Sequence, residues 1–245
     1  MPQLCGRRDE RRQARIGHSA PPIFESLPSL ILQFMLQIHQ PKTSVTTGGD
    51  TDNGGPGFIL GDADFTNDGQ GHYYFIYENA RDTHPWKYTL LTPGTSIFIS
   101  VCNTFHGRIV RGNPNFNLEP GTVNNLGTWV EMGWEAPEGK VAWGDVSLLE
   151  GYDGAATLAA MDGSGVATGF DLDLLAGVPP GILTRKRDGS VAIAKTVGDG
   201  ANVAAKEYEL SKLSPTTQAS IVNAYKPVIG SRNARFNVTM YAGTY

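Results

Sequence analysis

The sequence predicts a mainly β protein, a β-sandwich or flattened barrel with a smaller loop-and-helix subdomain. Three observations support this prediction. Thirty Gly and fifteen Pro occur without a fixed period, which is typical of many turns between short strands. Runs of aromatic and β-branched residues recur along the chain and are bounded by turn signals. A chain of 245 residues with a hydrophobic fraction of 40% is sufficient for one substantial core.

The N-terminal residues 1–30 are expected to be a disordered extension of the domain. The apolar run at 27–38 follows an Arg-rich segment, but it is too short to span a bilayer and no small-residue cleavage site follows it. Its second half predicts a first strand over 33–40. A start of the functional chain at Met35, in place of Met1, is one hypothesis that this extension allows.

The expected domain covers 31–245, with core blocks over 72–155, a loop-and-helix subdomain over about 156–230 and a final strand over 235–241. The other expected strands, from their aromatic, apolar or β-branched content, lie at 72–78, 88–91, 96–101, 108–111, 127–134, 142–149 and 190–196. Good helix formers before Pro215 predict a helix over 202–213. Apolar residues recur at every third position in the segment that follows, which predicts a second helical piece over 215–225.

The charge pattern excludes one class of partner. The formal net charge is −4, and five arginines lie in the first fifteen residues, so the body of the chain is more acidic than the total. An acidic body with no stripe of Lys and Arg lacks the footprint that binding to a phosphate backbone requires. We therefore expect no nucleic-acid partner. We also expect no membrane span, while the oligomeric state stays open.

Cysteine usage bears on cofactors and on the cellular compartment. Cys5 and Cys102 are the only two cysteines, so there is neither a disulfide framework nor a C-x-x-C pair for zinc. Cys102 lies in an apolar run and is expected to be a small buried residue. We expect a disulfide-free chain without a metal or other cofactor. A cytoplasmic location is favoured over secretion because secreted domains often depend on disulfides.

Acidic residues interrupt two of the predicted strands. Alternation places Trp129 and Glu131 on one face of their strand, and Trp143 and Asp145 on one face of what is expected to be the neighbouring strand. A carboxylate within an apolar strand is unfavourable unless it is paired or wetted by a cleft. Either a structural ion pair with arginine or a solvent-filled binding site would offset the unfavourable free energy of each carboxylate. Glu150 joins Asp145 on one face only if a bulge or turn intervenes.

Two arginines and a histidine mark another predicted strand. Alternation places Arg108 and Arg111 on opposite faces, so one of them is expected to face inward or into a groove. Two solvated arginines on an edge strand are the alternative. His106 precedes them, and an imidazole can titrate near neutral pH, so His106 is a candidate catalytic residue as well as a candidate structural one.

An ordered set of short motifs resembles the thaumatin-like proteins. The motifs are the strand over 73–79, LTPGT at 91–95, GRIVR at 107–111, the strand over 126–134 and DVSLLEGY at 145–152. They are similar to the family's GRIW-x-RT, TL-x-EF and YDVSLVDGYN blocks, in the same order, over roughly residues 72–155. The chain is also similar to the fungal proteins described as antigenic thaumatin-like.

This resemblance implies an acidic cleft that binds β-1,3-glucan, which some members hydrolyse weakly. It implies that the cleft arginine is Arg111 or Arg108. The implied cleft carboxylates are Glu131, Asp145 and Glu150, the last in place of an aspartate. In such a cleft Glu131 can protonate the glycosidic oxygen and Asp145 can activate water.

Four aromatic residues are candidate sugar-stacking surfaces, namely Trp129, Trp134, Trp143 and Tyr152. Two features depart from the family. Plant members contain many disulfides, and the segment 161–225 carries none of the family's cysteine-rich pattern.

Three functions therefore stay open. The first is binding, with possible weak hydrolysis, of a glucan polysaccharide in the cleft. The second is an intracellular enzyme on the same scaffold that catalyses the acid/base cyclisation or isomerisation of a small metabolite, which the scarcity of cysteine favours. The third is a non-catalytic defence or interaction protein whose carboxylates only pair with arginine.

Overall fold

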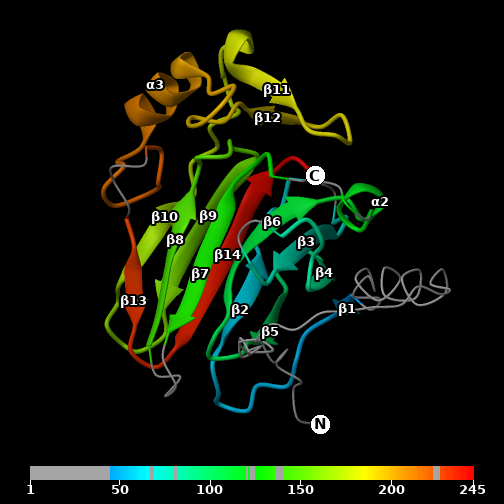
Figure 1. Cartoon of the computed structure of the whole chain (residues 1–245), viewed down its shortest axis with the longest axis vertical. Helices are drawn as coiled ribbons and strands as arrows, with labels where there is room; N and C mark the ends of the chain where they lie inside the picture. The colour runs from blue at the N-terminus through cyan, green and yellow to red at the C-terminus, as the bar shows by residue number, and fades with distance from the viewer. Residues whose placement is uncertain are drawn as a thin grey trace, which may run out of the picture. The chain divides into compact units, whose positions relative to one another are not determined.

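Two β-sheets contain most strands of the described chain (Figure 1). The seven-stranded sheet has the order β1 (Thr46–Thr47), β4 (Lys87–Leu91), β3 (His72–Tyr77), β6 (His106–Gly112), β7 (Trp129–Glu135), β8 (Val141–Ser147) and β13 (Ile229–Ser231). The five-stranded sheet has the order β10 (Ala167–Phe170), β9 (Gly154–Ala160), β14 (Arg235–Gly243), β2 (Gly57–Asp62) and β5 (Ser96–Ser100). Neighbouring strands are antiparallel except β1 with β4 and β14 with β2.

The structure is a computed structural model that describes residues 45–66, 69–79, 82–119, 121, 125–135, 141–222 and 227–245. Residues 45–245 form one compact unit of the chain. The extension expected over 1–30, the strand expected over 33–40 and the choice of starting methionine lie outside the described residues.

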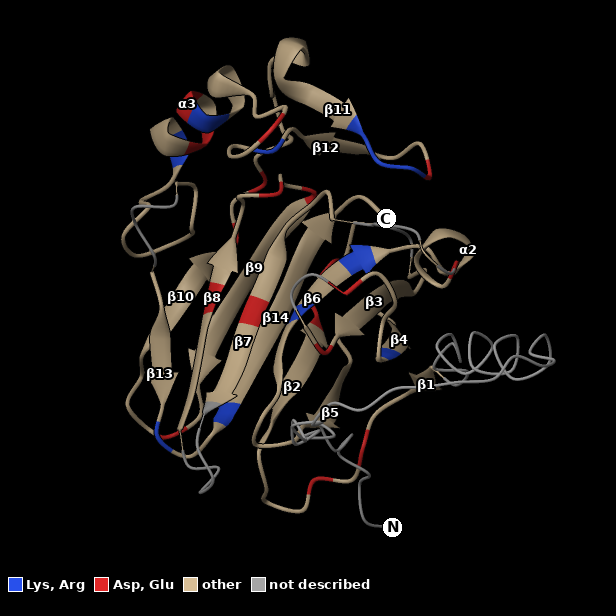
Figure 2. Cartoon of the chain, viewed as in Figure 1, with Lys and Arg blue, Asp and Glu red and all other residues tan. Residues whose placement is uncertain are grey.

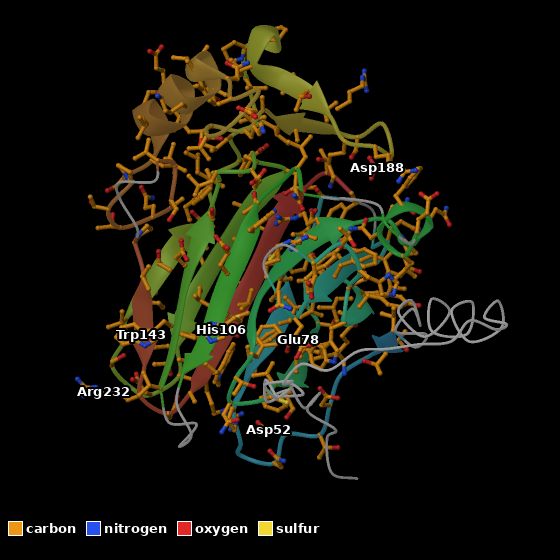
Figure 3. The ribbon with its side chains drawn as sticks, viewed as in Figure 1. Asp52, Glu78, His106, Trp143, Asp188 and Arg232 are labelled. Carbon is orange, nitrogen blue, oxygen red and sulfur yellow. The ribbon has the colours of Figure 1, made fainter. Side chains whose placement is uncertain are left out.

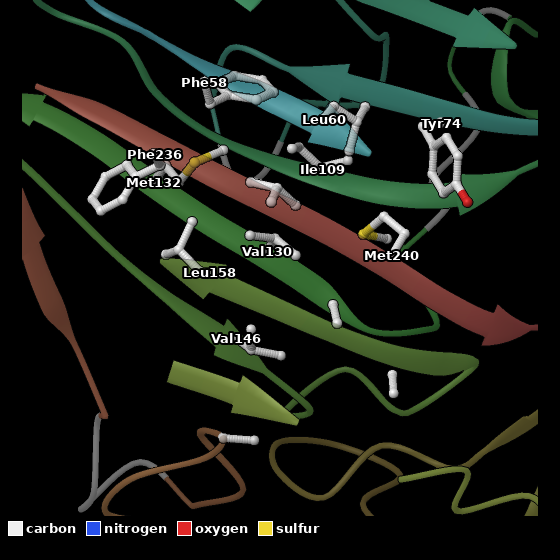
Figure 4. Packing of buried hydrophobic residues seen from close by; sticks show 14 of the residues in the cluster. Phe58, Leu60, Tyr74, Ile109, Val130, Met132, Val146, Leu158, Phe236 and Met240 are labelled. Atoms are coloured by element: carbon white, nitrogen blue, oxygen red, sulfur yellow. The ribbon is translucent and has the colours of Figure 1, made fainter. Parts of the chain in front are cut away.

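The main core lies between the two sheets, where alternate residues of each strand face inward (Figure 4). The seven-stranded sheet contributes Ile109, Val130, Met132 and Val146, and the five-stranded sheet contributes Phe58, Leu60, Leu158, Phe236 and Met240. Each fully buried apolar side chain of this size stabilises the fold by roughly 1.5–3 kcal/mol. The mainly β class predicted from the sequence is confirmed.

The segment 171–222 lies largely outside the two sheets. It contains η1 (Pro180–Ile182), the hairpin of β11 (Leu183–Arg185) and β12 (Val191–Ile193), and α3 (Val203–Lys212). Tyr152 and Ile193 exchange backbone hydrogen bonds of 3.1 and 2.8 Å, which attach the hairpin to the end of the sandwich. A short helix, α2 (Pro114–Asn117), follows β6.

One predicted helix is confirmed and the other is wrong. The side chain of Asn202 accepts a hydrogen bond from Ala205 N and starts α3 where the sequence predicts a helix. The expected helical piece over 215–225 is instead turns and irregular chain in its described part, 215–222. Ser220 is fixed there by bonds between its backbone and the end of β8, to Val146 O and from Leu148 N, both 2.8 Å. This pairing replaces the intrahelical bonds that a helix would need.

Two further findings concern cysteine and membranes. Cys102 is half-buried in the connection after β5, so it is less buried than expected. It is the only cysteine among the described residues, so no disulfide joins one described strand to another. Within the described ranges, no helix is both long and apolar enough to cross a membrane.

Candidate functional site

Three central strands of the seven-stranded sheet bring the charged candidates into one row. Arg108 of β6 pairs with Glu131 of β7, and Glu131 pairs with Asp145 of β8. The core side chains of these strands are the intervening residues, so this row projects from the outer face of the sheet. Acidic residues mark the middle of β7 and β8 in Figure 2. Directly opposed residues have Cβ atoms about 4.5–5.5 Å apart, so the two carboxylates are close neighbours.

In a second row on the same face, aromatic side chains alternate with glycines from one strand to the next. His106 pairs with Gly133, Gly133 with Trp143, and Trp143 with Gly230, across β6, β7, β8 and β13. A Cβ atom built on Gly133 would lie 2.8 Å from His106 Nδ1, and one on Gly230 would lie 2.8 Å from Trp143 Cζ3. Each ring therefore lies against a glycine of the neighbouring strand, in space that any larger residue would occupy. Figure 3 labels both rings.

Residues of both rows line one open groove with a volume of about 260 Å³, although Arg108 and Gly230 do not line it. His106, Glu131, Trp143 and Asp145 line it, together with Val228 beside β13. Trp143 is 46% exposed and offers an aromatic surface to solvent. The structure thus brings four of the predicted site residues into one place.

The carboxylate of Asp145 is oriented from outside the sheet. The hydroxyl of Ser220 donates a 2.6 Å hydrogen bond to Asp145 Oδ2. Ser220 is itself buried, and its two backbone bonds to the end of β8 fix its position. Ser220, Gly133 and Gly230 carry no motif that marks them as site residues in the sequence, and their place at or beside the groove emerges from the fold. A glycine in the middle of a predicted strand can mark close approach of a ligand or a side chain, and this signal could have identified Gly133.

Arg108 lies on the outer face but is fully buried. Its guanidinium lies between the rings of Tyr77 and Trp129, with Cζ 4.0 and 4.4 Å from the two ring centroids. Nη2 also donates to Asn125 Oδ1 at 3.3 Å. Arg108 therefore places a fixed positive charge next to Glu131 in register. Its guanidinium covers Trp129, which is 3% exposed and does not line the groove.

Arg111 points the other way, into the space between the sheets, as alternation requires. It donates to Gly154 O at 3.1 Å, Ala155 O at 2.5 Å and Tyr241 O at 2.9 Å, and Nη1 lies 3.5 Å from Asp153 Oδ1. These contacts tie β6 of one sheet to β9 and β14 of the other. Arg111 therefore links the two sheets and does not belong to the groove.

Three other candidates also lie away from the groove. Trp134 is buried in the main core, where Nε1 donates to Ala234 O at 2.9 Å. Tyr152 is buried beyond β8, and its hydroxyl donates to Leu172 O at 3.2 Å. Glu150 lies in the turn after β8, and its carbonyl accepts from Gly127 N at 3.1 Å. None of the three lines the groove.

A second set of polar side chains is buried inside the sandwich. His72 Nδ1 lies 2.7 Å from Asp62 Oδ2, and Nε2 lies 3.9 Å from Asp64 Oδ2. Tyr245 stacks on His72 with a centroid separation of 4.1 Å. Burial alone would raise the pKa of Asp64, but hydrogen bonds from Thr66 help to hold it below its ordinary value. We interpret this cluster as structural, because none of these groups lines the groove.

Within the described ranges, no group of three or more His, Cys, Asp and Glu side chains is placed to hold a metal ion. No protein-family model matches the chain, and a search of curated proteins finds no significant match.

Proposed function

We propose that the groove binds a β-1,3-glucan. The observation that carries this proposal is a single open groove in which two neighbouring carboxylates lie beside a half-exposed tryptophan. Sugar rings present hydroxyl groups that donate to carboxylates and C–H faces that pack on an indole. The groove is smaller than the roughly 300–1,000 Å³ of pockets that enclose a whole ligand, so it suits a short stretch of a longer chain. The resemblance to thaumatin-like proteins favours the β-1,3 linkage.

Weak hydrolysis of the glucan is part of this proposal. Glu131 protonates the glycosidic oxygen, and Asp145, oriented by Ser220, activates water. A carboxylate that activates water lies roughly 6.5–9.5 Å from the acid, and Cβ atoms about 4.5–5.5 Å apart allow this separation when the side chains of Glu131 and Asp145 diverge. The carboxylates alone supply the acid and the base.

A second candidate is an enzyme that cyclises or isomerises a small metabolite by proton transfer. The observation that favours it is His106, which adds an imidazole to the two carboxylates in a groove of modest volume. Imidazoles and carboxylates are common general acids and bases.

The experiment is a titration of the full chain with laminarin, a soluble β-1,3-glucan, by calorimetry, combined with an assay for new reducing ends. Glu131→Gln and Asp145→Asn are each expected to weaken binding about tenfold, since each removes a hydrogen bond to a charged group. Glu207→Gln and Asp199→Asn are matched controls at exposed positions away from the groove. Equal binding by the wild type and both groove variants would show that the groove assignment is wrong. Binding of small metabolites without laminarin would favour the second candidate.

A further inference from the structure

A second cavity, separate from the groove, lies where β6 and the segment after it meet the turn between β11 and β12. Its volume is about 110 Å³. Arg111, Arg185, Lys186 and Arg187 line it, and Asp188 is the one lining carboxylate among the described residues. Figure 2 shows the basic residues at the end of β11 and in the following turn, where Figure 3 labels Asp188. We propose that this cavity binds a small oxyanion, either inorganic phosphate or the phosphate group of a larger molecule.

The inner wall of this cavity carries an uncompensated positive charge. Arg111 and Lys186 share one carboxylate, Asp153, at 3.5 and 3.0 Å. The side chains of Arg111 and Asp153 are 0% exposed, and that of Lys186 is 9% exposed. Two buried cations against one carboxylate are unfavourable in a low-dielectric interior. An anion in the adjoining cavity would neutralise the excess.

Hydrogen-bond donors remain on the same wall. Lys186 Nζ donates to Asp153 at 3.0 Å and to Thr244 O at 3.3 Å, while an ammonium carries three hydrogens, so one is left for a ligand. The Nε of Arg111 is also buried without an acceptor, but it lies against Gly243 and is not counted among the donors to the cavity. An oxyanion, whose oxygens only accept, matches donors that a sugar hydroxyl or a cation would satisfy less well.

The outer wall of the cavity adds two arginines and two carboxylates, so the excess of positive charge on the inner wall stays. Arg187 lies 2.7 Å from Glu119 in an exposed pair. Arg185 is exposed and donates to the backbone carbonyl of Gly189 at 2.7 Å. Asp188 already accepts from the backbone and the hydroxyl of Ser190 at 2.8 and 2.5 Å.

Among the side chains that the structure describes, four cations thus face three carboxylates, namely Asp153, Glu119 and Asp188. Two other buried carboxylates, Asp62 and Asp64, do not line the cavity, and the Tyr245 hydroxyl donates to Asp64 at 3.3 Å.

The cavity is small. Its volume of about 110 Å³ is well below the roughly 300–1,000 Å³ of pockets that enclose a whole drug-sized ligand. A phosphate or sulfate suits a small cavity with cationic walls. A larger phosphorylated molecule would insert only its phosphate group.

The test is a titration of the full chain with inorganic phosphate at constant ionic strength, with chloride as the balancing anion. Saturable binding by calorimetry and a rise in Tm are expected with phosphate and not with chloride. Arg185→Gln is expected to weaken phosphate binding about tenfold. Arg232→Gln removes the same charge at an exposed position in another loop and is expected to change nothing (Figure 3).

Lys186→Gln is expected to weaken phosphate binding more than Arg185→Gln does. If Lys186→Gln does not fold, the phosphate affinity of Arg185→Gln alone tests the proposal. Equal effects of phosphate and chloride would overturn the proposal, as would equal phosphate affinity in Arg185→Gln and Arg232→Gln. Phosphate binding that exceeds binding of glycerol 2-phosphate would support a free phosphate ligand, and the reverse order would support a phosphate group on a larger molecule. Glu131→Gln is expected to retain phosphate binding, which separates this site from the groove.

Discussion

Replacing Gly133 by alanine would test how the groove is built. The new Cβ would lie 2.8 Å from Nδ1 and 3.2 Å from Cε1 of His106. Ordinary van der Waals contact needs about 3.5 Å, so the imidazole has to move by at least about 0.7 Å. His106 is exposed, so its ring can move without disturbing the core. We therefore expect the free energy of unfolding to change by less than about 1 kcal/mol.

The same change is expected to impair the groove strongly. Gly133 lies in register between His106 and Trp143, and the methyl group would project into the space between their rings. A glucan that packs on Trp143 beside Glu131 would meet both the methyl group and the displaced imidazole. We expect laminarin binding to weaken about tenfold, a loss of about 1.4 kcal/mol.

Calorimetric titration with laminarin measures this loss, and urea unfolding measures the stability. Gly61→Ala in β2 is the matched control, because its new Cβ would meet no atom closer than 3.7 Å. It is expected to leave binding unchanged. Unchanged laminarin binding in Gly133→Ala, or an equal loss in Gly61→Ala, would refute the reasoning.

Three further predictions concern stability and orientation. Burial raises the pKa of Glu209 well above its ordinary value of 4.5. As pH rises above about 4.5, Glu209 therefore ionises in the unfolded chain before it ionises in the folded one. The free energy of unfolding then falls by up to about 1.4 kcal/mol per pH unit. Glu209→Met is expected to stabilise more at pH 7 than at pH 5 in urea unfolding, and equal gains would contradict this. Arg111→Met is expected to destabilise by about 3–5 kcal/mol in the same assay, because it removes the link between the sheets; a loss under about 1 kcal/mol would contradict it. Ser220→Ala is expected to weaken laminarin binding severalfold with little change in Tm, because Asp145 loses its orienting hydroxyl, and unchanged binding would contradict this role.

Local patterns in the sequence were sufficient to predict most of the strands and the faces of the charged residues. The aromatic and β-branched runs gave β3 and β5 within a residue of their observed ends. The strand β9 was missed because its sequence, GAATLAA, consists mostly of small residues with weak strand preference. It is stabilised by pairing with β14 and β10 on both sides, and sequence alternation does not report such pairing.

The candidate site was only partly predictable for the same reason. Alternation placed Glu131 on the same face as Trp129, and Asp145 on the same face as Trp143, and the register confirms that these residues project from one side of the sheet. The order His106, Gly133, Trp143 and Gly230 across four strands depends on long-range pairing, which one sequence does not encode visibly. The buried position of Trp134 follows from alternation alone. Trp134 lies an odd number of positions from Trp129, so it projects from the opposite face of the strand, into the core.

The most direct test of the account follows the indole N–H signals of the tryptophans by NMR during a titration with a laminarin oligosaccharide. Trp143 is 46% exposed in the groove, whereas Trp134 is 0% exposed in the core. Trp143→Phe and Trp134→Phe assign the two signals. We expect the Trp143 signal to shift in a saturable manner while the Trp134 signal stays in place. A saturating glucan that leaves the Trp143 signal unmoved would contradict the proposed groove.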